Sequence, residues 1–354
     1  MAVSALDSIT LAIEHTRQQL FRPFRIGQWT KLAFVGLLAG ELGANGCNRS
    51  NFNFPHHAGA VAPHFAWPSS FGVDHALLLL LIASTLMAAF AIGIILMYVS
   101  SVMRFVLFDS IVARDCRIRW EWTRRLGPGW RFFVFKLFFA FAILAAFLAL
   151  VVLPVAFAFV AGWLREPREH LLPLILGGTF LFLVLFILFI AAAVILVLTK
   201  DFVIPQMALE DVDAMEAWRR LLPMMNADKA SYAAYIGMKI LLAIVVAVLI
   251  GFATIVLGLM IAVPGVAFGL LAVLTGKAAG LTWTPATIAL AASIGLTLLA
   301  GFLYLVSLVA VPAIVFFPAY SIYFFASRYP RLATALYAQS PAPQAPPSAA
   351  PAPA

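Results

Sequence analysis

Glu41 is the first residue whose type and position suggest chemistry, because it is an acidic side chain in the apolar segment GLLAGELGANG. It lies ten residues after Lys31, which is about 15 Å along a helix that rises 1.5 Å per residue. A carboxylate at that depth in a membrane faces protein or water, where it can titrate or hold an ion. The alternative is a short helix that leaves Glu41 near the outer face, bonded to backbone or water. Gly36, Gly40 and Gly43 share one side of this helix and would let a neighbour approach closely.

Metal-capable side chains follow in the segment CNRSNFNFPHHAGAVAPHFAWPSSFGVDH, which contains Cys47, His56, His57, His64 and His75. Thiolates and imidazoles are common metal ligands. Their spacing here matches no standard site, and adjacent histidines rarely chelate one metal well. We favour a structured Pro/aromatic cap over the outer face, with metal binding at His56, His57 and His64 as the alternative.

Motifs for catalysis or cofactor binding do not occur in the sequence. It has no nucleophile elbow, P-loop, dinucleotide fingerprint or HExxH pattern. We therefore expect a protein that is not an enzyme, with no catalytic residues and no cofactor.

The composition predicts a membrane protein. The chain is 64% hydrophobic and 11% charged, whereas soluble domains are about 45–50% apolar and about 25% charged. The formal net charge is +8, but the basic residues flank apolar runs instead of forming one patch. They suit contacts with anionic lipid headgroups, and nucleic acid is not an expected partner.

Apolar runs of about 20 residues predict six transmembrane helices, arranged as three helical hairpins in an all-α fold. The expected spans cover residues 26–43, 76–103, 132–160 and 172–198, and the last two start near residues 234 and 286. Both of these final runs are too long for one straight crossing. We expect Pro264 to end the fifth span, leaving GVAFGLLAVLTG as a packed or re-entrant helix, and Pro312 and Pro318 to kink or end the sixth.

Basic residues predict that both termini are cytoplasmic, since cytoplasmic connections carry the excess of Lys and Arg. Three segments are basic: the N-terminal one, the second-to-third connection and the fourth-to-fifth connection (Arg17, Arg22, Arg25 and Lys31; Arg104, Arg114, Arg117, Arg119, Arg124, Arg125 and Arg131; Lys200, Arg219, Arg220 and Lys229). We expect Arg104 with Asp109, and Lys200 with Asp201, to pair or to reach the headgroups at the ends of the second and fourth spans.

Two cytoplasmic segments resemble each other: IVARDCRIRWEWTRRLGP at residues 111–128 and QMALEDVDAMEAWRRLLP at residues 206–223. Each follows a long span and precedes another whose start carries a lysine, Lys136 or Lys239. TRQQLFRPF and QWTKLAF, with Lys31, form a weaker third copy near the N-terminus. We therefore predict three degenerate repeats, at about residues 1–110, 111–205 and 206–338. Their expected interfacial anchors are Trp29, Trp122, Arg124, Arg125, Trp218, Arg219 and Arg220.

Each repeat should begin with an amphipathic helix in the headgroup plane. In AMEAWRRLLPMM the apolar residues share one side, Asp213 can cap the helix with Glu216 as reciprocal partner, and Glu216 and Arg220 are spaced to pair. Residues 1–25 form the N-terminal cytoplasmic helix, whose stripe is Leu6, Ile9, Ile13 and Leu20. Residues 26–338 form the transmembrane domain, and the Pro/Ala-rich residues 339–354 form a disordered tail.

The segment from VIP at Pro205 through Glu210 to AMEAWRRL resembles bacterial multi-pass proteins, including the membrane domain of some glycerophosphoryl diester phosphodiesterases. The segment RPFRIGQWTKLAFVGLLAGELGANG is similar to stand-alone members of that group. The resemblance covers most of the six-helix region, without a catalytic barrel. It implies a six-helix body in the bacterial inner membrane and no catalytic residues.

Two functions agree with these observations. The first is a non-catalytic scaffold or accessory component in contact with the lipid bilayer, with a membrane-protein partner or a second copy of the chain. The alternative is a transporter for a small molecule, ion or lipid that uses a cavity near Glu41 and the break at Pro264. The apolar middles of spans two to four argue against a polar substrate path.

Overall fold

The computed structural model describes residues 4–22, 24–41, 75–163, 170–278, 280 and 285–337, and its regular structure is helical throughout these residues. Five helical stretches there are long and apolar enough to cross a membrane, which fits a multi-pass membrane protein. They belong to α4 (His75–Val112), α6 (Leu126–Val160), α7 (Leu171–Leu198) with its continuation, α10 (Lys229–Ala278) and α11 (Pro285–Ala326). The shorter elements are α1 (Ala5–Phe21), α2 (Ile26–Ala39), α5 (Ile118–Arg124), the π-helical η1 (Thr199–Val203), α8 (Ile204–Glu210), α9 (Ala214–Ala227) and α12 (Pro330–Tyr337).

The expected first span is shorter in the structure than in the prediction. Helix α2 has 14 residues, which is about 21 Å of helix, and the hydrocarbon layer is about 30 Å thick. It ends because Gly40 adopts a left-handed conformation (φ 78°) and donates its N–H to carbonyls of the last turn. Helix α2 is therefore not among the five membrane-spanning candidates, and Glu41 follows a helix end.

The prediction that Pro264 ends the fifth span is wrong. Helix α10 has 50 residues in total and continues through Pro264, and α11 continues through Pro312 and Pro318. An apolar helix that stopped inside the hydrocarbon would leave several backbone N–H and C=O groups without partners. A proline removes only one such hydrogen bond, so continuing the helix costs less than ending it.

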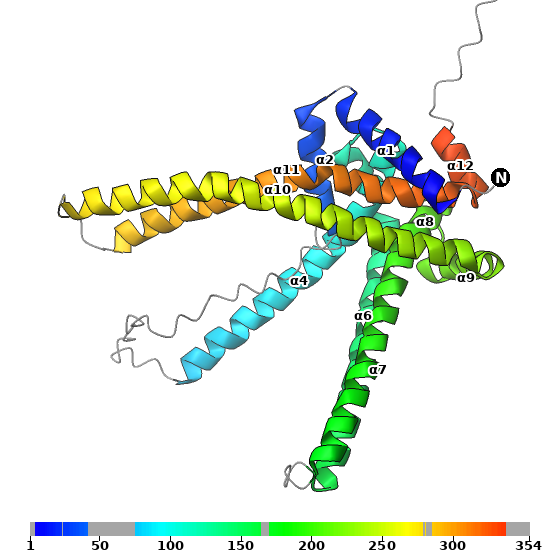
Figure 1. Cartoon of the computed structure of the whole chain (residues 1–354), viewed down its shortest axis with the longest axis horizontal. Helices are drawn as coiled ribbons and strands as arrows, with labels where there is room; N and C mark the ends of the chain where they lie inside the picture. Colours follow the sequence, from blue (N-terminus) through cyan, green and yellow to red (C-terminus); the bar gives the residue numbers. More distant parts are fainter. Residues whose placement is uncertain are drawn as a thin grey trace, which may run out of the picture.

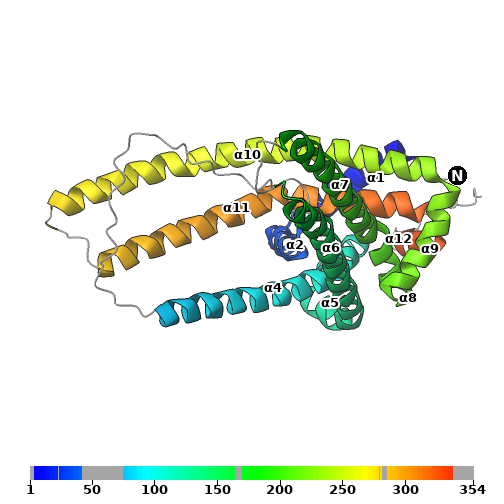
Figure 2. The ribbon, with the colours of Figure 1, turned by 90° about the horizontal axis from the view of Figure 1, so that it is seen from below.

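The buried core lies where one end of each long helix meets the short helices. We call this region the hub; it comprises residues 102–112 of α4, 198–208 and 310–326, with the packed faces of α1 and α2. From the hub, α4, the α6–α7 pair and the α10–α11 pair extend in different directions as three arms (Figures 1 and 2). The outer parts of the arms carry mainly exposed Leu, Ile, Val and Phe side chains.

Helix α1 packs on α11 with a face that its apolar pattern predicts only in part. The buried residues are Ser8, Ala12, His15, Thr16, Gln19 and Leu20, and the Nδ1 atom of His15 lies 3.1 Å from the hydroxyl of Tyr323. Leu20 belongs to the expected apolar stripe, whereas Leu6 and Ile13 of the same stripe are 62% and 54% exposed.

Candidate functional site

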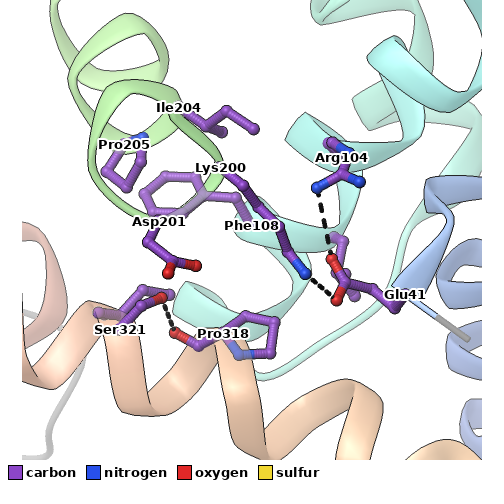
Figure 3. A pocket seen from close by; sticks show the side chains of 11 residues that line it. Glu41, Arg104, Phe108, Lys200, Asp201, Ile204, Pro205, Pro318 and Ser321 are labelled. Atoms are coloured by element: carbon purple, nitrogen blue, oxygen red, sulfur yellow. Dashed lines mark hydrogen bonds and ion pairs between the residues drawn. The ribbon is translucent and has the colours of Figure 1, made fainter. Parts of the chain in front are cut away.

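Glu41 is the centre of a buried ionic cluster in the hub. Its carboxylate accepts a hydrogen bond from the ammonium of Lys200 in η1, and it lies 3.7 Å from the Nη1 atom of Arg104 in α4. The Glu41 side chain is 1% exposed, and the two cationic side chains are each 14% exposed. Figure 3 shows both cations pointing at the carboxylate from neighbouring elements. Gly40 ends α2 beside this point, and Glu41 directly follows it at the hub.

The next residue of η1 forms the second half of the cluster. The Asp201 carboxylate accepts hydrogen bonds from the ammonium of Lys239 and, at 3.0 Å, from the hydroxyl of Tyr235, both on α10. A wider π turn presents these consecutive side chains in different directions, Lys200 toward Glu41 and Asp201 toward α10. Such turns are frequent at functional sites. The expected pairing of Lys200 with Asp201 is therefore replaced by contacts to two other elements.

Two cationic side chains thus face one carboxylate that has almost no contact with solvent. A buried carboxylate of this kind is stable only while its cationic partners remain in place.

A cavity of about 600 Å³ lies between the α6–α7 arm and the start of α10. That volume is within the usual range of about 300–1,000 Å³ for small-molecule sites. Its basic lining consists of Arg104, Lys136, Lys200 and Lys239, and no acidic residue is among the described residues that line it. Its apolar lining comes mainly from α6, α7 and α10 (Phe132, Phe135, Phe189, Ile190, Ala193, Val194, Leu196, Val197, Ile236, Ile240 and Ala243).

A second cavity of about 30 Å³, large enough for water, lies beside the same ionic cluster. It is lined by Glu41, Arg104, Lys200 and Asp201, together with Pro318 and Ser321 of α11 (Figure 3). Arg104 and Lys200 line both cavities. They therefore separate the two carboxylates from the larger, basic cavity.

Asp109 does not pair with Arg104 as expected. Its two carboxylate oxygens accept hydrogen bonds from Arg125 at 2.6 and 2.7 Å, while a third N–H of Arg125 donates to the carbonyl of Ala208 at 2.8 Å. Arg125 is buried and joins α4 to α8 inside the hub, so its described contacts are with the protein. The interfacial role of Arg125 stays a prediction.

The other predicted anchors divide into two groups. Trp29, Trp122 and Trp218 are half-buried against the hub, where the indole N–H of Trp29 donates to the carbonyl of Leu20 and that of Trp218 to the hydroxyl of Thr199. Three arginines form the second group and are exposed: Arg124, Arg219 and Arg220. Arg124 lies over the ring of Trp120, and the other two donate hydrogen bonds to Glu216. The expected pairing of Glu216 with Arg220 is thus confirmed, whereas the side chain of Asp213 forms no capping hydrogen bond.

The structure brings together residues that the sequence did not connect. The predicted repeats place Lys136 and Lys239 at equivalent positions but do not predict that they are neighbours. In the structure both lysines line one cavity. Tyr235 had no sequence signal, because its role depends on the position of Asp201. Cys47, His56, His57 and His64 lie outside the described residues, so the metal alternative stays a prediction.

The geometry fits binding of an anion better than a covalent reaction. Cations from α4, α6, η1 and α10 converge on one cavity, and the carboxylates that neutralise some of them lie behind it. Charge-assisted hydrogen bonds from several such donors bind oxyanions well.

Comparison with known proteins places the chain in a family without assigning it an activity. No curated protein and no solved structure matches it. The resemblance to the membrane domain of glycerophosphoryl diester phosphodiesterases therefore stays a prediction, as does the internal repeat. A family model matches residues 3–335, which include all the helices described above except the last two residues of α12. The chain belongs to this family, which is described as a family of unknown function (DUF7544).

Proposed function

We propose that this protein is a non-catalytic scaffold or accessory component of the bacterial cytoplasmic membrane, with six crossings in three hairpins and both termini in the cytoplasm. The observation that carries the proposal is the contrast between the packed hub and the bare arms. In α4 and α10, none of the most apolar stretch of 18 residues is buried within the chain. Apolar surface of this extent has to be covered by lipid or by other transmembrane helices.

The direction of the arms favours other helices as the cover. Helices that cross one flat bilayer tilt by about 0–40° from its normal, whereas the arms diverge widely from the hub (Figure 1). A second transmembrane chain, either a different protein or another copy of this one, would cover the exposed outer parts of the arms.

The test is native mass spectrometry of the protein extracted gently from its own membrane, combined with site-specific photocrosslinking. A crosslinking residue is placed on the arms at Phe182 and Leu249, and at Trp120 in the short helix α5 as a control of similar exposure. We expect a protein of defined mass to be crosslinked from the arms and not from α5. Adducts with lipid alone, and a monomer in the mass spectrum, would contradict the proposal.

A transporter is the second candidate, and the buried cluster around Glu41 beside a water-sized cavity favours it. Transport through this cluster requires the Glu41 carboxylate to change partners or protonation. The variant Glu41→Gln combined with Lys200→Met removes both charges of the pair, so the hub does not retain an unpaired lysine. Uptake of candidate substrates is measured in cells that carry the wild type or the double variant. Loss of uptake by a folded double variant would support transport, whereas unchanged uptake would show that transport does not depend on Glu41.

A further inference from the structure

We propose that the cavity of about 600 Å³ binds an anionic lipid, with its headgroup beside Arg104, Lys136, Lys200 and Lys239 and an acyl chain along the apolar wall. This inference goes beyond the scaffold function and does not require a partner chain on the arms. It follows from three independent features: the charge balance, an unpaired buried donor and the shape of the wall.

The charge balance of the cavity is positive. Glu41 pairs with Arg104 and Lys200, and Asp201 pairs with Lys239, so four cations share two carboxylates. Lys136 takes part in no salt bridge within the described residues, unlike Lys200, which pairs with Glu41, and Lys239, which pairs with Asp201. The four cations thus exceed the two carboxylates by two positive charges, and Lys136 has no acidic partner among the described residues, an arrangement that is costly unless an anion completes it.

Arg104 also has an unused donor. Its Nε atom is buried and has no hydrogen-bond partner in the described part of the chain, although its Nη1 atom pairs with Glu41. Buried N–H groups in native proteins almost always have a partner. An oxyanion in the cavity that Arg104 lines would supply several acceptor oxygens at once.

The wall extends from this basic end along α7 and α10. Phe189 lies eleven residues before Lys200, which is about 16 Å along the helix. Phe189 of α7 and Ile240 of α10 both line the cavity and are largely exposed, so the apolar wall is accessible to lipid. A free inorganic anion would leave this wall unused, whereas a lipid with a phosphate headgroup and an acyl chain matches both ends.

Phosphate oxyanions are the shared chemistry of two ligand sources, an acidic lipid and free phosphate, and the experiment distinguishes them. The full-length protein in detergent is titrated with phosphatidylglycerol or with phosphatidylcholine of the same acyl chains, and native mass spectrometry counts the bound lipids. We expect one phosphatidylglycerol to bind in preference to phosphatidylcholine. Inorganic phosphate at millimolar concentration should not displace it.

Variants test the two ends of the cavity separately. Lys136→Gln should weaken phosphatidylglycerol binding about tenfold, as expected for loss of one charge-assisted contact, whereas Lys229→Gln, an exposed lysine elsewhere on α10, should leave it unchanged. Ala193→Trp fills the wall without changing the charge and should also abolish binding. Its control, Ala191→Trp, lies outside the cavity lining.

Three results would overturn the proposal. Equal binding of the two lipids would exclude recognition of the anionic headgroup, and unchanged binding by a folded Ala193→Trp variant would exclude the apolar wall. Displacement by free phosphate would assign the basic end to a soluble anion. The unfolding midpoint of each variant in detergent establishes that a loss of binding is not a loss of fold.

Discussion

Replacing Glu41 by Gln should lower the free energy of unfolding by about 3 kcal/mol, because it leaves Lys200 and Arg104 buried without their carboxylate. At an effective dielectric constant of about 20, the 3.7 Å contact with Arg104 alone corresponds to about 4 kcal/mol of Coulomb attraction. The contact with Lys200 adds to this attraction, while relief of the burial cost of the carboxylate offsets part of it. Reversible unfolding of the purified protein by denaturing detergent, followed by tryptophan fluorescence, measures the difference.

Glu14→Gln is a matched control. Glu14 lies at the same 3.7 Å from Arg17, but both side chains are about half exposed, so the pair is screened by water and contributes at most about 1 kcal/mol. If Glu41→Gln costs no more than Glu14→Gln, the argument that buried charges hold the hub together is refuted. Combining Glu41→Gln with Lys200→Met should cost less than the sum of the single changes, because neither charge is then left alone.

Three further changes test packing, burial and hydrogen bonding by the same unfolding measurement. Gly36→Ala should destabilise by about 1–3 kcal/mol, because the added Cβ would lie 2.4 Å from Ile314, whereas Gly27→Ala, with no such atom within 4 Å, should be nearly neutral. Burial and the charge of a nearby arginine lower the pKa of His15 from 6.5 to about 4, so the unfolded chain binds a proton there that the folded chain does not. Stability should therefore decrease by up to about 3 kcal/mol as the pH falls from 6.5 to 4, and His15→Gln should remove this dependence. Arg125→Lys should cost about 1–3 kcal/mol, since lysine cannot reproduce the two-point contact with its aspartate partner, and a neutral result would contradict the buried clamp.

The membrane class and most of the long helices follow from the sequence, because an apolar run of more than 20 residues is long enough to cross the hydrocarbon layer as a helix. The helix ends are harder to predict. By the rules for water-exposed helices, Pro264 predicts the end of a helix. In hydrocarbon, however, backbone N–H and C=O groups without partners at a helix end cost more than the one hydrogen bond that a proline removes. Conversely, Gly40 is a typical residue just after a helix end, and its left-handed conformation shortened α2 where hydropathy alone extended it.

The site is only partly predictable from the sequence. The acidic side chain of Glu41 in an apolar segment marks it as unusual, but its partners do not follow from the sequence. Its partners Arg104 and Lys200 are 63 and 159 residues away in sequence, and local spacing cannot reveal such contacts. The same holds for Arg125, whose buried role depends on α4 and α8 meeting beside it.

The predicted repeats suggest how a basic cavity arises from simple parts. The second and third copies each place a lysine near the start of a long helix, and these two, Lys136 and Lys239, line the same cavity. The first copy has Lys31 at the equivalent place, but this side chain is exposed, and α2 supplies Glu41 at its other end instead. The second and third predicted copies thus contribute lysines to the cavity, while the first contributes Arg104 and the Glu41 carboxylate that pairs with Arg104 and Lys200. Lengthening α2 by replacing Gly40 with a strong helix former would move that carboxylate, so the short helix is itself a requirement for the site.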